Sequence, residues 1–211
     1  MGFIYFLFYN LTKLIARVFF RYRVINAEAF DRVPKGQGAL LASNHVSFID
    51  PPLVGSALDY GAYYLARKSL WSNPVASYIY DRLQALPVDQ EKPEFGSLKK
   101  IIKLAKSGEK VIIFPEGERS LDNKLGPGLP GVGLMIAKSR VPVIPCRLFG
   151  AYEALPRGKS LPRPSRITLV VGEPMYFTDE ELNVKDKDAY AALSQRVMDE
   201  IAKLELVENY E

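Results

Sequence analysis

Short apolar runs alternate with longer amphipathic stretches along most of the chain. The apolar runs predict strands at Ala39–Ser43, Tyr63–Arg67, Ala85–Val88, Val111–Phe114, Val143–Phe149 and Ile167–Val171. The other stretches predict helices at Pro51–Leu58, Pro74–Leu83, Phe95–Ser107, Gly131–Lys138 and Asp186–Leu206. Because strands separated by helices favour α/β layering, we expect residues 31–211 to form a single α/β domain, with a largely parallel mixed sheet flanked by helices.

The first 30 residues follow a different pattern. Phe3 to Tyr9 is an unbroken apolar and aromatic run, and Lys13, Arg17 and Arg21 recur at four-residue spacing, which places them on one face of a helix. No stretch reaches the ~18 uncharged apolar residues of a spanning helix. We therefore expect residues 1–30 to form an amphipathic helix lying in a membrane surface. Packing on the domain or in a dimer is the alternative.

Composition and charge narrow the classes of partner. The 211 residues are 48% hydrophobic and 25% charged, as in ordinary globular proteins. The net charge of +4 divides into +3 for residues 1–30, +8 for residues 31–172 and −7 for residues 173–211. The excess positive charge of residues 31–172 favours an anionic partner, such as a phosphorylated small molecule or an anionic membrane. Nucleic acid ranks lower, because no recognition motif is present.

The single histidine lies in the first of two motifs. His45 leaves an apolar strand, and Asp50 follows five residues later as the expected N-cap of a helix. A histidine oriented by a carboxylate is a suitable general base. The alternative is that Asp50 only caps the helix and His45 is a structural polar residue. Ser47 is near in sequence only and no nucleophile motif is present, so such a base would activate a bound hydroxyl or water.

The second motif is the segment 114–120, Phe-Pro-Glu-Gly-Glu-Arg-Ser, which directly follows the most apolar strand. Ligands of open α/β sheets bind at the carboxyl ends of strands. Gly117 permits a tight turn, Arg119 offers a planar fork for phosphate, and Ser120 and Lys124 add donors. The alternative is an exposed turn in which Glu118 and Arg119 are only solvated.

Together these motifs resemble the glycerolipid acyltransferase family, which includes 1-acylglycerol-3-phosphate acyltransferases. The resemblance rests on Asn44-His45 with Asp50, followed by the segment 114–120. Two softer blocks agree, one at Ala66-Arg67-Lys68 with residues 86–89, the other at residues 141–146. The match covers about residues 38–178.

The resemblance implies a membrane-surface O-acyltransferase in which His45 is the general base and Asp50 its partner. The acyl donor would be acyl-CoA or acyl-ACP (acyl carrier protein), with no metal or bound cofactor. The implied location is the cytoplasmic face of a membrane, as a peripheral or monotopic protein, and the oligomeric state is open. The substrate-binding residues would be Asn44, Arg67, Lys68, Glu116, Gly117, Arg119, Ser120 and Lys124.

Three departures from the family pattern concern the acceptor. Glu118 stands where Thr is common, Gln90 where Arg is usual, and Leu129 where Lys is common. Each makes the presumed phosphate pocket less cationic. We expect 1-acylglycerol-3-phosphate as acceptor, giving phosphatidic acid, with another lysophospholipid or lipid alcohol as the alternative. The same residues are also compatible with a thioesterase or with a non-catalytic lipid-binding protein.

Overall fold

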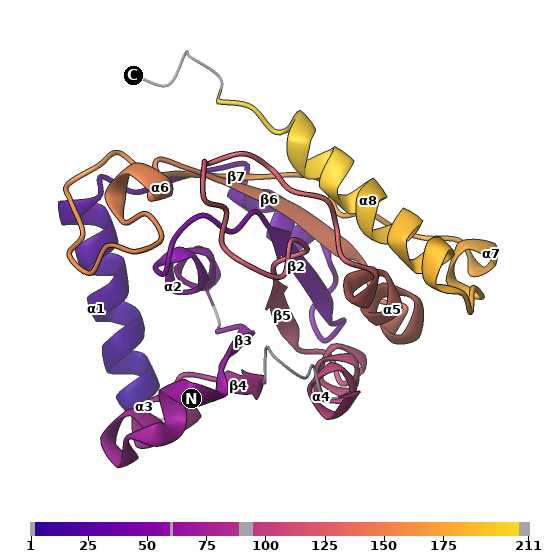
Figure 1. Cartoon of the computed structure of the whole chain (residues 1–211), viewed down its shortest axis with the longest axis horizontal. Coiled ribbons are helices and arrows are strands. Elements are labelled where there is room, and N and C mark those ends of the chain that lie inside the picture. Colours follow the sequence, from indigo (N-terminus) through magenta and orange to yellow (C-terminus); the bar gives the residue numbers. More distant parts are fainter. Residues whose placement is uncertain (1–2, 60, 89–94, 207–211) are drawn as a thin grey trace.

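A seven-stranded sheet organises the molecule in the computed structural model, which describes residues 3–59, 61–88 and 95–206 (Figure 1). The strands are β1 (Arg23–Ile25), β2 (Ala39–Ser43), β3 (Tyr63–Arg67), β4 (Ala85–Val88), β5 (Lys110–Ile113), β6 (Val143–Phe149) and β7 (Thr168–Val171). Their order is β1-β7-β6-β2-β5-β3-β4, and every neighbouring pair is parallel except β6 and β7. The expected largely parallel mixed sheet is confirmed.

Helices cover both faces of this sheet. The helices are α1 (Phe3–Phe19), α2 (Asp50–Ser56), α3 (Pro74–Arg82), α4 (Phe95–Lys106), α5 (Pro130–Ser139), α6 (Ala151–Ala154), α7 (Asp179–Leu182) and α8 (Lys187–Lys203). Two 3-10 helices, η1 (Ala27–Arg32) and η2 (Lys68–Ser72), complete the described elements. α1 and α2 lie on one face of the sheet, and α4, α5 and α8 lie on the other (Figure 1).

The alternation of side chains along β2 explains the two cores. Leu41 is fully buried in the core under α1 and α2, whereas its neighbours Leu40 and Ala42 are fully buried in the core under α4, α5 and α8. A strand buried on both faces reads as a continuous apolar run, which is why Ala39–Ser43 was recognisable from its sequence.

The structure places part of the N-terminal segment in the α/β domain. β1 pairs with β7, and α1 ends at Phe19. Ala16 and Phe20 are almost fully buried in the core that α2 shares. We expected residues 20–30 to belong to the N-terminal helix, but in the structure they are part of the α/β domain. β1 is three half-exposed residues long, too short for an alternating pattern to reveal it.

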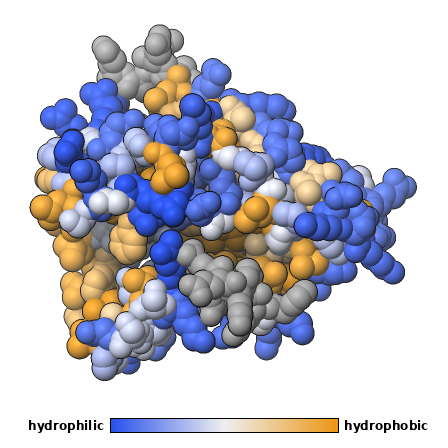
Figure 2. Space-filling model, in the orientation of Figure 1, coloured by the Kyte–Doolittle hydropathy of each residue, from blue (hydrophilic) through white to orange (hydrophobic). Residues whose placement is uncertain are grey.

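The outer face of α1 remains apolar and exposed. Its exposed hydrophobic side chains are Phe3, Phe6, Leu7, Leu11, Leu14, Ile15, Val18 and Phe19. Figure 2 shows hydrophobic residues gathered on the left of the molecule, where α1 lies in Figure 1. Within the described ranges, no helix is long and apolar enough to cross a membrane. The helix thus packs on the domain with one face, and none of the residues that the structure describes covers the opposite face.

Candidate active site

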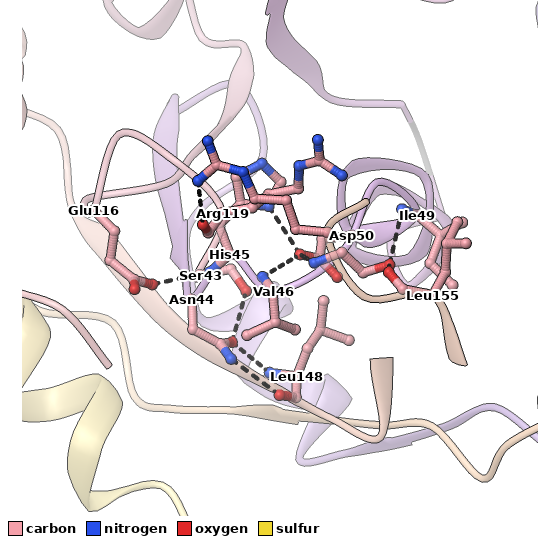
Figure 3. Close-up of polar contacts among 12 residues, drawn as sticks. Ser43, Asn44, His45, Val46, Ile49, Asp50, Glu116, Arg119, Leu148 and Leu155 are labelled. Atoms are coloured by element: carbon pink, nitrogen blue, oxygen red, sulfur yellow. Dashed lines mark hydrogen bonds and ion pairs between the residues drawn. The ribbon is translucent and has the colours of Figure 1, made fainter. Parts of the chain in front are cut away.

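The two motifs meet at one edge of the sheet. β2 and β5 are parallel neighbours, so the loops that follow them leave from the same edge. The backbone N–H of Ser120 donates to the carbonyl of His45 at 2.7 Å. The N–H of His45 donates to the Glu116 Oε1 at 2.9 Å (Figure 3). Residues more than seventy positions apart in sequence are thus joined directly by hydrogen bonds.

Asp50 orients the imidazole of His45. Its fully buried Oδ2 lies 2.8 Å from the His45 Nδ1 and accepts from the N–H groups of Val46 and Ser47, both at 2.7 Å (Figure 3). The expectation that Asp50 is the N-cap of α2 is wrong. Ile49 is the N-cap and no side chain caps the helix, because the carboxylate turns back to the loop that precedes it.

This arrangement determines which nitrogen of His45 can act as a base. With a carboxylate at Nδ1, the neutral ring carries its proton on Nδ1 and leaves a lone pair on Nε2. The ring stacks on Phe114, with centroids 4.1 Å apart and an angle of 20° between planes. The His45 side chain keeps 18% of its surface exposed. The site therefore holds a fixed, accessible imidazole that can remove a proton from a bound hydroxyl or water.

Glu116 joins the loop after β2 to the loop after β5. Besides the N–H of His45, its carboxylate accepts from the N–H of Gly126 at 3.0 Å. Burial raises the pKa of this carboxyl above its ordinary value, while the two N–H donors act in the opposite direction. Both oxygens of this expected substrate-binding residue are thus engaged by backbone, and Glu116 holds the His45 loop in place.

Asn44 and Ser47 support the same loop. The Asn44 amide donates to the carbonyl of Leu148 on β6 at 3.0 Å and accepts from the Leu148 N–H at 2.7 Å. The Ser47 hydroxyl donates to the carbonyl of Leu155 at 2.7 Å and is fully buried. Asn44 was expected to bind substrate, but its amide faces the backbone of β6. Ser47 is no candidate nucleophile, because its hydroxyl points away from His45 into a backbone contact.

Gly117 makes the turn of the second motif. Its φ of 74° lies in the left-handed region, and its N–H donates to the carbonyl of Phe114 at 3.0 Å. A Cβ added at this position would lie 2.3 Å from the Leu129 Cδ1. Any side chain at residue 117 would therefore strain the backbone and displace Leu129.

Arg119 lies near enough to two further arginines, Arg67 and Arg157, to feel their charges. Arg119 lies next to His45 at the sheet edge (Figure 3). Partial burial, followed by the positive charges of Arg67 and Arg157, lowers the pKa of the Arg119 guanidinium, and Asp50 acts in the opposite direction. Cations that repel one another in this way stabilise a bound anion, so the cluster suits a phosphate.

Sequence reasoning did not assign Arg157 to the site. The Arg157 Nη1 donates to the Glu118 Oε2 at 2.9 Å and to the carbonyl of Arg119 at 3.2 Å. Glu118 is therefore ion-paired as well as solvated. The available signal was the basic, proline-containing segment after the strand Val143–Phe149, because β6 ends at the same sheet edge as its parallel neighbour β2.

The remaining expected residues lie further out. Lys124 is 82% exposed and pairs with Asp122 at 3.2 Å, and the structure shows no contact between it and the motif residues. Lys68 is exposed at the start of η2, directly after Arg67. Gln90, one of the departures from the family pattern, lies outside the described residues.

Fold and site together define an acyl-transferring enzyme built on an α/β sheet, with a histidine–aspartate pair at the sheet edge. The model of the family described as Acyltransferase matches residues 24–148, a range that includes both motifs. The chain belongs to this Acyltransferase family, and it is an O-acyltransferase.

Named relatives extend the match over most of the chain. A Bacillus subtilis protein named 1-acyl-sn-glycerol-3-phosphate acyltransferase is 30% identical over 197 residues, which are 93% of this chain and 94% of that protein. A Streptococcus pneumoniae protein of the same name is 23% identical over 178 residues, covering 83% of this chain and 64% of its own. The crystal structure of the 1-acyl-sn-glycerophosphate (LPA) acyltransferase PlsC from Thermotoga maritima has the same fold. Its TM-score is 0.67 at 24% identity, over 94% of this chain and 80% of that one.

Proposed function

We propose that this enzyme transfers an acyl group from a thioester donor to the free hydroxyl of 1-acylglycerol-3-phosphate and so forms phosphatidic acid. The observation that carries the proposal is the His45–Asp50 pair held beside the Arg119 cluster at one sheet edge. The names of the relatives in Bacillus subtilis and Streptococcus pneumoniae support the same acceptor. The donor, acyl-CoA or acyl-ACP, enters as a substrate, and the reaction needs no bound cofactor.

The reaction uses one base and no protein nucleophile. The His45 Nε2 removes the proton of the acceptor hydroxyl as its oxygen attacks the thioester carbonyl, and the new C–O bond forms. The resulting tetrahedral intermediate collapses with cleavage of the C–S bond, and the imidazolium returns its proton to the departing thiolate. The Asp50 carboxylate at Nδ1 stabilises the imidazolium between these two steps.

The acceptor phosphate binds at the arginine cluster. Arg119 and Arg67 supply cations from the loop after β5 and from the end of β3, and Arg157 adds a third from the loop after α6. Arg157 also neutralises Glu118, which stands where the family commonly has threonine. This pair offsets the negative charge that Glu118 adds, which is one of the three departures from the family pattern.

The enzyme meets its lipid substrate at a membrane surface. The exposed apolar face of α1 lies in the acyl region, and Lys13 and Arg17 of the helix lie at head-group level, together with Arg21, which the structure places beyond the end of α1 and not on its face. We place this contact on the cytoplasmic leaflet, as a peripheral or monotopic association, because soluble acyl carriers are the donors.

A transfer assay tests the proposal. The purified full chain is incubated with acyl-CoA or acyl-ACP and with vesicles carrying a panel of lysolipids, and thiol release and lipid products are measured together. We expect one phosphatidic acid per thiol released, with the highest kcat/KM for the phosphate monoester acceptor. Thiol release that does not depend on acceptor would replace the proposal with a thioesterase. Faster transfer to a lysolipid with a larger head group would overturn the assignment of the acceptor.

A further inference from the structure

A basic, proline-containing loop connects the candidate active site to the end of α1. This loop, residues 156–166, follows α6 and begins with Pro156 and Arg157 at the catalytic edge of the sheet. Directly after it, the N–H of Ile167 donates to the carbonyl of Phe20, and the Ile167 carbonyl accepts from the N–H of Arg23, both at 3.0 Å. In Figure 1 the loop crosses toward α1, on the side of the molecule opposite α7.

The tip of this loop combines an exposed apolar side chain with unpaired cations. Leu161 is 80% exposed, the highest value among the large hydrophobic residues in the described ranges. The loop contains four basic residues and no acidic one. Of these, Lys159, Arg163 and Arg166 are exposed and form no ion pair within the part of the chain that the structure describes.

Backbone hydrogen bonds at the two ends of the segment around Leu161 hold it in one conformation. The N–H of Arg163 donates to the carbonyl of Ala154 at 2.8 Å, and the N–H of Lys159 donates to that of Pro156 at 3.2 Å. Pro162 and Pro164 further restrict the backbone. Leu161 is thus presented to solvent by an ordered turn, and an apolar side chain displayed in this way favours a contact site.

We propose that the loop 156–166 is a second membrane-contact element, which inserts Leu161 into an anionic bilayer beside α1. Its cations complement anionic head groups, and its C-terminal end is tied to the chain just beyond α1 by the hydrogen bond between Ile167 and Phe20. One cation near an anionic leaflet increases partitioning about fivefold. Two contacts separated along the molecule fix its tilt on the bilayer, which a single helix does not.

This contact also bears on the acceptor site. Arg157, at the base of the loop, hydrogen-bonds the carbonyl of Arg119 and pairs with Glu118. Docking of the loop therefore turns the arginine cluster toward the leaflet that supplies the lysolipid. This consequence rests on the proposed function, whereas the membrane contact itself does not.

Vesicle binding of the full chain, measured without substrate, tests the contact. Leu161→Asp should weaken binding to phosphatidylcholine vesicles containing phosphatidylglycerol by at least about tenfold. The matched control is Tyr176→Asp, which adds the same charge at an exposed residue beside Met175. Met175 pairs with Val143, the first residue of β6, so this control lies at the opposite sheet edge. It should leave binding within about twofold of the wild type.

Lys159→Ala with Arg163→Ala isolates the charge contribution. This double variant should lose about 25-fold toward vesicles with phosphatidylglycerol and little toward phosphatidylcholine alone. Wild-type vesicle binding by both the Leu161 variant and the double variant, with unchanged thermal unfolding, would overturn the proposal. Loss of acyl carrier protein binding with vesicle binding intact would overturn it too, and would make the loop a protein-docking surface.

Kinetics then test the link to the acceptor site. Leu161→Asp should raise the KM for lysolipid in vesicles and leave turnover of a monomeric short-chain lysolipid unchanged. An equal loss with both acceptors would contradict a membrane role, because a disturbed active site lowers both. If no acceptor is acylated at all, the proposed function fails while the vesicle-binding result still decides the contact.

Discussion

The edge of the sheet and the outer face of α1 are built on opposite principles. At the sheet edge, hydrogen bonds within the protein hold the polar side chains: the Asp50 Oδ2 contacts three N–H groups, and both oxygens of Glu116 accept backbone N–H groups, while the buried Asp50 Oδ1 has no partner among the described residues. On α1, most of the outward side chains are apolar, and among the residues that the structure describes nothing covers them.

This difference shows which part of the function each region can perform alone. Hydrogen bonds within the protein fix the imidazole before any substrate binds, so the chemistry is preorganised. The apolar face of α1 is exposed to water at a cost in free energy, and an exposed apolar patch of this kind is typical of a contact site. Catalysis should therefore depend on single residues, whereas membrane contact should depend on the sum of several.

His45→Ala should have the largest effect. Removing the only imidazole should lower kcat by at least about 10²-fold, because a positioned general base contributes a factor of at least this size. Steady-state kinetics on vesicle-borne acceptor give the measurement, and vesicle binding should be unchanged. Turnover equal to the wild type would show that the ordered sheet edge is not the catalytic region.

Glu116→Gln should disturb the support of the loop. A glutamine has one acceptor oxygen for two backbone N–H donors, so one of them is left without a partner at a cost of about 1–3 kcal/mol. Chemical denaturation measures the free energy of unfolding, and turnover should fall with it. An unchanged stability would mean that this cross-link does not hold the His45 loop.

The difference in the free energy of unfolding between the wild type and Glu116→Gln should change with pH in one known direction, which provides a control. Burial raises the pKa of Glu116 above its ordinary 4.5, so the folded state binds this proton more tightly than the unfolded state. As pH rises from 4.5 through the raised pKa, the wild type should lose stability relative to Glu116→Gln, which does not titrate. If the wild type instead gained stability relative to Glu116→Gln as pH rises, the raised pKa of Glu116 would be contradicted.

Leu14→Ser with Val18→Ser should weaken the membrane contact without affecting the fold. These side chains are 59% and 71% exposed, so unfolding should change by only about 0.5 kcal/mol for each. Partitioning to anionic vesicles should fall at least about tenfold. Deleting residues 1–22 is a poorer test, because it also removes Ala16 and Phe20 from the core. Unaltered partitioning of the double variant would contradict the role of α1.

Ser47→Ala should have the smallest effect. The variant loses one buried hydrogen bond to the carbonyl of Leu155, which costs about 1 kcal/mol of stability. Turnover should stay within about threefold of the wild type, because no covalent step passes through this hydroxyl. A loss comparable to that of His45→Ala would indicate a protein nucleophile.

The sequence predicted the parts of the molecule that local patterns encode. Strands buried on both faces are apolar runs, so the fold class was accessible. The pairing of His45 with Asp50 was one of two interpretations of their spacing, and the family resemblance favoured it. Contacts set by the packing of distant segments were not. The turn of Asp50 away from the helix it begins, the engagement of Asn44 and Glu116 by backbone, and the approach of Arg157 to Arg119 all depend on three loops meeting at one sheet edge.

The state of the imidazole itself is the most direct test of the account. Because His45 is the only histidine, its two ring nitrogens give the only imidazole signals in a long-range ¹H–¹⁵N spectrum of the labelled protein. The structure predicts a neutral ring protonated at Nδ1 toward Asp50 with Nε2 bare, and Asp50→Ala should abolish this preference. A neutral ring protonated at Nε2 would contradict the account, because that nitrogen would have no lone pair to accept the hydroxyl proton.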